Sequence, residues 1–324
     1  MSRTVLIAIG GNALIREGEG GSLSIQAERA REFAETIADL IEDGWTPIIT
    51  HGNGPQVGFI LRRGELAASD AKAEKLPALP LWLAVADSQG GIGHIITAAL
   101  NSVMRQRHLS NPVAALLTHT VVDIDDPAFI RPTKPIGAWL DAEMARRHVV
   151  EDGWDVEEVE AGSFRRVVAS PEPLEVLELE AIRTLVKSNA VVVAAGGGGI
   201  PVTICEGELV SVDAVIDKDR VSALLAAKLR ANVLVMVTGV DRVFVDFRGP
   251  QEQALDVITV EQASTFASQG HFPAGSMGPK MESAISFVNG CGSDAVITSI
   301  EFVREALRGL AGTRIVAVLE GLEP

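Results

Sequence analysis

The sequence predicts an α/β fold with a mainly parallel central sheet. Residues 190–195 form an unbroken run of small and β-branched apolar residues, which is typical of a strand buried on both faces of such a sheet. Residues 4–9 and 47–50 are two more apolar runs, separated by an amphipathic helical pattern. All three runs lead into glycine-rich turns. Parallel strands bring such turns to one sheet edge, where ligands of open α/β sheets bind, so we expect the functional site there.

The first part of the chain contains a strand, a helix and a second strand. The strand at 4–9 runs into the turn GGNAL at 10–14, and the strand at 47–50 runs into HGNGPQ at 51–56. Between them, the pattern predicts a helix over 24–43. Its apolar stripe consists of Ala27, Ala30, Phe33, Ala34, Ile37, Leu40 and Ile41.

Two segments before residue 120 give weaker signals. Residues 66–81 are expected to be a surface segment that is either mobile or partly helical. The glycines within 88–93 are expected to start or interrupt a helix that continues to about residue 107. A strand is predicted at 113–118.

The segment from 123 to about 168 is expected to leave the sheet as a protruding subdomain. Prolines at 127, 132 and 135 exclude a regular helix at its start. Lys134 lies between Thr133 and Pro135 in this segment. It is either an exposed turn lysine or a lid lysine that reaches over a substrate.

The second half is organised around residues 190–229. Four glycines at 196–199 follow the buried strand and let the backbone approach a ligand closely. A short hairpin with CEGE at its turn follows, and the next helix is predicted at 220–229, with Asp217 or Asp219 as its cap. Further along, the patterns predict strands at 233–237 and 294–298, and helices from Lys280 to about 289 and over 300–310.

Lys218 stands between two aspartates at the expected start of the 220–229 helix. It could be a solvated loop charge, or a fixed cation that contacts a phosphoryl group. Only 7 of the 28 basic residues are lysines, and three of these, Lys134, Lys218 and Lys280, fall within candidate site motifs. We therefore interpret this region as a phosphate-handling centre.

Composition limits the possible partners. The net charge of −15 argues against nucleic-acid and anionic-membrane partners, because both require a basic face. An anionic small substrate is still possible, since one cation at about 4 Å contributes about 4 kcal/mol at an effective dielectric near 20. The two cysteines form no disulfide framework, no apolar run reaches the ~20 residues of a membrane helix, and the N-terminus has no export pattern, so a cytoplasmic protein is expected.

The nucleotide motifs of other folds are missing. The GxGxxG fingerprint fails at residue 52, where the sequence reads GNGPQV, and the GxxxxGK[ST] pattern does not occur. His51 has no second ligand at metal-binding spacing, and Asp123, Asp125 and Asp126 lack the spacing of a calcium loop. The residues therefore predict no protein-held metal.

Six motifs together resemble carbamate kinase, a family with the amino acid kinase fold: GGNAL at 10–14, THGNGPQVG at 50–58, DPAF with PTKPIG within 126–137, AAGGGGIPV at 194–202, VIDKD at 215–219 and AGSMGPK at 274–280. The resemblance implies a three-layer αβα sandwich. It places carbamate or carbamoyl phosphate in an N-terminal half, 1–190, which carries the protruding subdomain at about 123–168. The nucleotide is expected in a C-terminal half, 191–324.

The resemblance also implies the reaction ATP + carbamate ⇌ ADP + carbamoyl phosphate with Mg²⁺, in a homodimer of arginine metabolism that makes ATP from carbamoyl phosphate. Lys218 and Lys280 match lysines that contact the transferred phosphoryl group, Asp219 matches the carboxylate that orients them, and Lys134 matches the subdomain lysine. The matches to the substrate cradle are Gly10, Gly11, Asn12, Gly52, Asn53 and Gly54. The matches in the nucleotide half are Gly197, Gly198, Gly199, Asp241, Met277 and Gly278.

Two departures leave other functions open. Residues 238–244 read TGVDRVF where the family has a pattern like TDVDGVY, and Asp87 stands where Met is more frequent; a carboxylate there would repel an anionic substrate unless it is paired or turned away. The alternatives are a kinase of another small carboxylate, amide or carbamate, and a catalytically silent nucleotide or phosphate sensor. The presence of Lys134, Lys218, Asp219 and Lys280 together argues against the sensor, and the missing fingerprint argues against a dinucleotide oxidoreductase.

Overall fold

A computed structural model describes residues 3–10, 22–69, 76–77, 79–273 and 276–318. Its centre is an eight-stranded sheet with the order β15-β17-β16-β12-β1-β2-β9-β3. Every neighbouring pair in it is parallel except β16 and β17, which confirms the predicted mainly parallel sheet. The strands are β1 (Arg3–Ile9), β2 (Trp45–His51), β3 (Val113–Ala115), β9 (Val191–Val193), β12 (Val233–Val237), β15 (Val257–Thr259), β16 (Asp294–Thr298) and β17 (Thr313–Val316).

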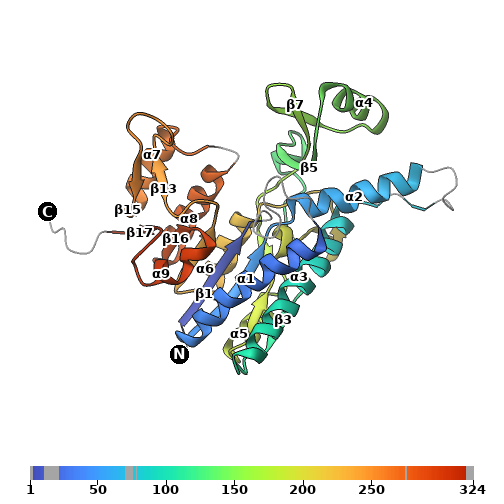
Figure 1. Cartoon of the computed structure of the whole chain (residues 1–324). Helices are drawn as coiled ribbons and strands as arrows, with labels where there is room; N and C mark the ends of the chain where they lie inside the picture. The colour runs from blue at the N-terminus through green and yellow to red at the C-terminus, as the bar shows by residue number, and fades with distance from the viewer. Residues whose placement is uncertain (1–2, 11–21, 70–75, 78, 274–275, 319–324) are drawn as a thin grey trace.

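Helices cover both faces of this sheet (Figure 1). On β1, Val5 and Ile7 pack with helices α1 (Leu23–Glu42), α3 (Leu81–Gln106) and α9 (Val303–Leu307). Leu6 and Ala8 point to the opposite face, where they pack with α5 (Leu179–Lys187), α6 (Lys218–Leu229) and α8 (Met277–Cys291). Because alternate residues of a strand point to opposite faces, β1 is apolar throughout. The three-layer αβα sandwich is confirmed.

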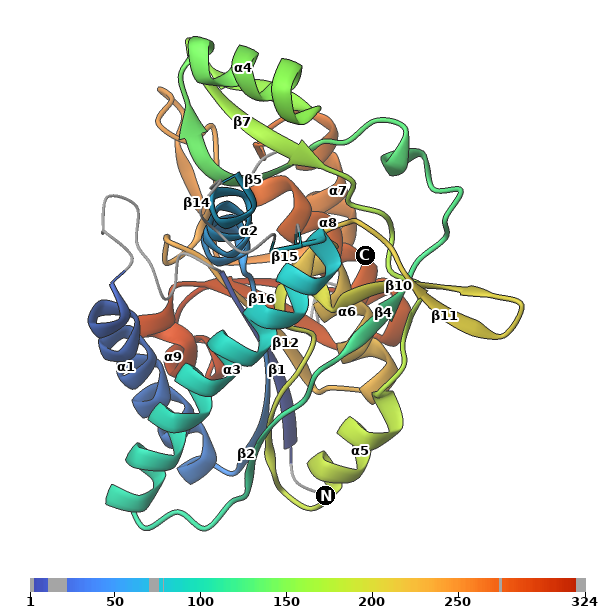
Figure 2. The same cartoon turned by 90° about the vertical axis from the view of Figure 1, so that its right-hand side faces the viewer.

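A second sheet lies beside the first, in the order β11-β10-β4-β8. It contains β4 (His119–Val121), β8 (Glu175–Val176), β10 (Ile200–Cys205) and β11 (Glu208–Ser211). The predicted hairpin is present: Glu206 and Gly207 both have positive φ angles, as a two-residue type I′ turn requires. Figure 2 shows this hairpin projecting from the body. A third pair, β13 (Val243–Val245) with β14 (Gln253–Leu255), precedes helix α7 (Val260–Ser268).

Residues 134–168 form a separate three-stranded sheet with one helix. After a short 3₁₀ turn, Pro127–Phe129, come β5 (Lys134–Leu140), α4 (Ala142–Asp152), β6 (Val156–Glu160) and β7 (Ser163–Val168), with the sheet order β5-β7-β6. This part projects from the body in both views (Figures 1 and 2). We call it the protruding subdomain.

Several predicted boundaries are wrong. Helix α2 (Gly54–Ser69) starts within the segment expected to be a turn, and α3 runs without a break through the glycines at 88–93. Each glycine costs a helix about 1 kcal/mol, but burial of the apolar face of α3 offsets this cost. The predicted strand at 113–118 is shorter than expected, because β3 ends at Ala115 and β4 of the second sheet begins only at His119. The predicted helix at 300–310 is a 3₁₀ turn, Ile300–Phe302, followed by the short α9. Within the described residues, no helix has the length and apolar character needed to cross a bilayer.

Candidate active site

A cavity of about 780 Å³ lies at the carboxyl edge of the central sheet. Gly10, Gly52, Thr238 and Ser299 follow β1, β2, β12 and β16 directly, and all four line it. The subdomain closes one side with Lys134–Ile136, and the start of α8 contributes Ser276 and Lys280. The site therefore lies where parallel strands end, as expected for an open α/β sheet.

The start of helix α6 brings three charged residues to this cavity, Asp217, Lys218 and Asp219. Asp217 is the N-cap: its Oδ1 accepts hydrogen bonds from the backbone N–H groups of Asp219 at 2.8 Å and Arg220 at 3.4 Å. This cap fixes the first turn of the helix. Lys218 and Asp219, the first two residues of α6, both line the cavity.

Asp219 bridges two lysines from different helices. The Nζ atom of Lys218 lies 2.6 Å from one oxygen of Asp219, and the Nζ atom of Lys280 lies 3.2 Å from the other. The Asp219 side chain is only 5% exposed. Two ammonium groups and one carboxylate leave a net positive charge at fixed positions, which suits an anionic ligand.

Burial and the neighbouring charges set the pKa values of this cluster. Burial alone would raise the pKa of Asp219, but Lys218 and Lys280 outweigh it and hold that pKa below its ordinary value. Burial lowers the pKa of the Lys218 ammonium, and Lys280 adds to this, whereas Asp219 opposes it. Asp219 is therefore ionised at neutral pH and compensates the two lysines.

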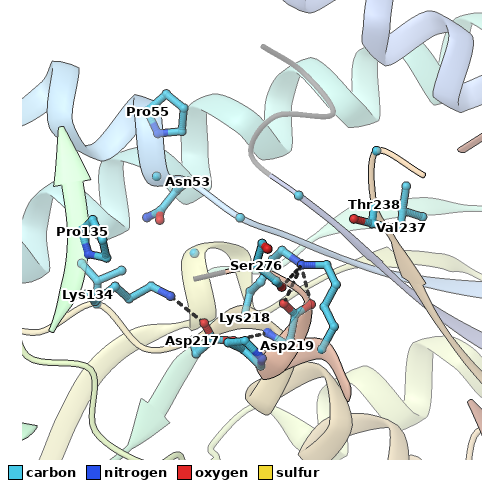
Figure 3. Close-up of a pocket in the computed structure, with 18 of the residues that line it drawn as sticks. Asn53, Pro55, Lys134, Pro135, Asp217, Lys218, Asp219, Val237, Thr238 and Ser276 are labelled. Atoms are coloured by element: carbon cyan, nitrogen blue, oxygen red, sulfur yellow. Dashed lines mark hydrogen bonds and ion pairs between the residues drawn. The ribbon is translucent and has the colours of Figure 1, made fainter. Parts of the chain in front are cut away.

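Lys134 reaches this cluster from the protruding subdomain. Its Nζ atom lies 2.6 Å from Oδ2 of Asp217, with 26% of the lysine side chain exposed. Figure 3 shows Lys134 pointing toward Asp217, beside Lys218 and Asp219. Burial would raise the pKa of Asp217, but Lys134 and then Lys218 lower it below its ordinary value. This placement favours a lid lysine over an exposed turn lysine.

His51 is a buried structural residue beside the cavity. Its Nδ1 atom lies 3.1 Å from the carbonyl oxygen of Gly52, within hydrogen-bond distance. Burial lowers its pKa to about 4, and Lys218 contributes to the decrease. His51 is therefore neutral at physiological pH. It packs closely against Gly196, where an added Cβ would lie 2.4 Å from its Nε2.

A model of the amino acid kinase family matches residues 3–299. The chain belongs to the amino acid kinase family. It is 43% identical over 318 residues to the carbamate kinase-like protein YahI of Escherichia coli K12, covering 98% of this chain and 99% of YahI. It is 41% identical to the carbamate kinase of Pyrococcus furiosus, with 97% and 99% covered. The structure of Giardia lamblia carbamate kinase bound to AMP-PNP superposes with a TM-score of 0.89 at 35% identity, covering 97% of this chain and 98% of that one.

In this amino acid kinase, most residues of the predicted substrate cradle lie together at the cavity. Gly10, Gly52, Asn53 and Gly54 all line the cavity. The Nδ2 of Asn53 donates to the Ser88 hydroxyl at 2.9 Å, which fixes the amide. Gly11 and Asn12 lie outside the described residues.

Of the three glycines predicted for the nucleotide half, Gly197 is the one that lines the cavity. An added Cβ there would lie 2.2 Å from Nδ2 of Asn53, so Gly197 is part of the cradle wall. Gly198 and Gly199 are not among the lining residues. A Cβ added to Gly198 would lie 2.3 Å from the carbonyl oxygen of Ile216, and a Cβ added to Gly199 would lie 2.0 Å from the Thr120 hydroxyl. Both glycines also have positive φ angles. Close packing and backbone conformation therefore both require glycine at these two positions.

Three more predicted nucleotide residues lie beside the cavity without lining it. Asp241 is exposed, and its backbone carbonyl accepts a hydrogen bond from Thr298. Met277 and Gly278 form the first turn of α8, where Met277 packs against the core and the N–H of Gly278 donates to the carbonyl of Pro273. Their neighbours Ser276, Pro279 and Lys280 face the cavity instead.

Several lining residues were not predicted. Thr238 and Ser299 are lining residues that follow β12 and β16, and the rule that ligands bind where parallel strands end could have found both. Asp217 was expected only as a possible cap, because its contact with Lys134 joins positions far apart in sequence. Asp87 is exposed on α3 and is not among the residues that line the cavity, so its carboxylate does not reduce the positive charge there.

Proposed function

We propose that this amino acid kinase is a carbamate kinase, which transfers a phosphoryl group reversibly between ATP and carbamate. The observation that carries the proposal is the arrangement of Lys134, Lys218 and Lys280 around two carboxylates at one cavity. Full-length identity of about 41–43% to carbamate kinases and carbamate kinase-like proteins supports the choice of substrate.

In the direction of ATP synthesis, a terminal phosphate oxygen of ADP attacks the phosphorus atom of carbamoyl phosphate. The bond between phosphorus and the carbamoyl oxygen breaks, and carbamate leaves with the bonding electrons. This reaction needs in-line positioning and charge neutralisation, not a protein nucleophile. In our proposal Lys218 and Lys280 neutralise charge on the transferred group, while Asp219 holds both ammonium groups in place.

We assign the two substrates to opposite sides of the cavity. The acceptor side consists of the cradle, Gly52–Gly54 with Gly197, and the subdomain residue Lys134. The nucleotide side consists of residues 237–239, Ser276 and residues 299–301. Both substrates can then meet at Lys218. Apart from Gly197, which lies on the acceptor side, this division follows the expected N-terminal and C-terminal halves, 1–190 and 191–324.

Mg²⁺ enters this proposal as part of the nucleotide substrate. In the part of the chain that the structure describes, no three His, Cys, Asp or Glu side chains gather to hold a metal ion. Asp217 and Asp219 already bind lysines. Phosphate oxygens and water are ligands that Mg²⁺ prefers, so Mg·ADP or Mg·ATP is the species that binds, and the ion supplies further charge neutralisation.

The same proposal includes a homodimer that works in the cytoplasm and supplies ATP from carbamoyl phosphate, as part of arginine metabolism. These points rest on the resemblance to carbamate kinase. Light scattering coupled to size-exclusion chromatography tests the proposed homodimer, because a dimer has twice the mass of one chain.

ATP formation from Mg·ADP and fresh carbamoyl phosphate tests the function. We expect Lys218→Ala to reduce kcat about 10²-fold or more, because the transition state loses a buried cation. The matched control is Lys228→Ala, which removes an exposed lysine from the same helix and should leave the rate unchanged. Both variants should show cooperative thermal unfolding.

Three results would contradict parts of the proposal. Full activity of Lys218→Ala would refute the role of the lysine cluster. If the wild-type protein makes no ATP but ADP raises its melting temperature, the nucleotide side stands and the acceptor is another small carboxylate or amide. If ADP has no effect either, the phosphotransferase assignment fails.

A further inference from the structure

Arg165 lies on β7 of the protruding subdomain and lines the cavity. Its Nη2 donates a hydrogen bond to the carbonyl oxygen of Gly137 at 2.8 Å, and its guanidinium lies 5.3 Å from the ring centroid of Trp139. These two contacts hold the side chain on the same wall as Lys134 and Ile136.

Unlike the three lysines of the cavity, Arg165 has no carboxylate partner among the described residues. Lys134, Lys218 and Lys280 each lie within 3.2 Å of an aspartate oxygen. Among the described residues, no carboxylate lies within ion-pair distance of Arg165, and its buried Nε atom has no hydrogen-bond partner. Burial lowers the pKa of this guanidinium, and no neighbouring acid raises it.

The next residue along the strand shows the opposite arrangement. Arg166 forms an ion pair of 3.2 Å with Glu65 of α2, and its guanidinium lies 4.6 Å from the ring centroid of Trp154. Arg166 does not line the cavity. Of these two adjacent arginines, the one without a carboxylate is the one that faces the cavity.

A partly buried cation without a counter-charge is costly, and an anionic ligand removes that cost. We propose that Arg165 binds the anionic acceptor, carbamate or the phosphoryl end of carbamoyl phosphate, from the subdomain wall of the cavity. The proposal rests on the function proposed above and adds a substrate-binding residue to it. Guanidinium suits this task because its planar set of N–H donors matches carboxylate and phosphate oxygens.

The location of Arg165 in the cavity indicates which of the two substrates it contacts. Arg165 lies on the wall formed by β5 and β7, together with Lys134–Ile136. The residues that follow β12 and β16 form the other wall, which we assign to the nucleotide. Arg165 should therefore affect carbamoyl phosphate more strongly than ADP.

Steady-state ATP synthesis by Arg165→Met, Arg165→Lys and Arg147→Met tests this inference. We expect Arg165→Met to raise KM for carbamoyl phosphate about tenfold or more, with KM for ADP within about twofold of wild type, because a hydrogen bond to a charged group is lost. Arg165→Lys should recover part of the effect, since it keeps the charge but not the planar donors. Arg147→Met removes the same charge from an exposed site on α4 and should change neither constant.

The inference is overturned if Arg165→Met leaves KM for carbamoyl phosphate unchanged, or raises only KM for ADP. If the wild-type protein makes no ATP, the proposed function fails, and calorimetric titration with inorganic phosphate then decides on Arg165. Phosphate binding that weakens about tenfold in Arg165→Met but not in Arg147→Met supports the anion site. Equal binding by all three proteins, or none by the wild type, refutes it.

Discussion

His51 illustrates how a single buried residue near the site can make the fold sensitive to pH. It is 1% exposed, and its pKa falls from 6.5 to about 4 because burial disfavours the imidazolium. Above pH 6.5 the ring is neutral in both the folded and the unfolded chain. Between pH 6.5 and 4 the unfolded chain binds a proton that the folded chain does not. The free energy of unfolding must therefore decrease as the pH falls through this window.

We expect this one histidine to reduce the free energy of unfolding by about 2 kcal/mol between pH 7 and pH 4.5. Replacing it with a residue that does not titrate, as in His51→Gln, should remove that part of the pH dependence even if packing defects lower stability at every pH. Urea unfolding at both pH values measures the difference. His94→Gln, which changes an exposed histidine on α3, is the control and should behave like wild type. Equal slopes for His51→Gln and wild type would contradict the pKa assignment.

At this scale, sequence motifs identified Lys134, Lys218, Asp219 and Lys280, and all four meet at the cavity. Local patterns also pointed to Asp217 as a candidate cap, because a helix start is encoded within a few residues. The resemblance also implied that Asp219 orients Lys218 and Lys280, but the contact of Lys134 with Asp217 was not predictable. Whether Arg165 or Arg166 lacks a carboxylate depends on the packing of β7 against distant elements.

Among the elements, α2 and β5 make an unusually close contact through two glycines. A Cβ added to Gly58 would lie 2.2 Å from the Cα atom of Gly137, which is a backbone atom and cannot rotate away. Gly137 itself has a φ of +73°, a conformation that favours glycine. The contact lets the first strand of the subdomain lie directly against α2, where Ile136 packs with Val57 and Leu61.

Gly58→Ala should therefore force α2 and β5 apart and destabilise the protein by about 1–3 kcal/mol, as overpacking does. Gly90→Ala is a matched control in helix α3, because a Cβ at Gly90 would meet no heavy atom within 4 Å. That substitution should stabilise the protein by about 0.4–1 kcal/mol. Urea unfolding of both variants measures the two effects. If Gly58→Ala leaves the free energy of unfolding unchanged or raises it, α2 and β5 can move apart without loss of stability, and the prediction is wrong.

Element prediction succeeded where periodicity was clean, as in β1, α1, β12 and β16. It failed at α2 and α3 because glycine was interpreted as a local break. In these helices tertiary burial outweighs the local preference, since Leu81, Ala84, Val85 and Val57 all pack in one core cluster. Local composition carries no information about that packing.

For the whole molecule, the sequence predicted the parallel sheet and the sheet edge that holds the site, because parallel strands must end together. The three-layer sandwich was expected from the resemblance to carbamate kinase. The sequence did not predict the strand order, which depends on which strands pair across the chain. It also gave no position for the protruding subdomain relative to the body. In the structure, side-chain ion pairs tether it: Lys134 to Asp217 at 2.6 Å and Arg166 to Glu65 at 3.2 Å.

Asp217→Asn separates the two tasks of this residue. Asparagine caps a helix about as well as aspartate, so the amides of α6 should keep their protection from hydrogen exchange. The charge that holds Lys134 is lost, so the amides of β5 should exchange about tenfold faster, as expected for the loss of a hydrogen bond to a charged group. Glu65→Gln removes the ion pair with Arg166. Comparing hydrogen exchange of β5 in the two variants shows how much each ion pair contributes to its protection. Unchanged exchange in β5 of Asp217→Asn would mean that backbone packing alone, including the contact of Gly58 with Gly137, holds the subdomain against the body.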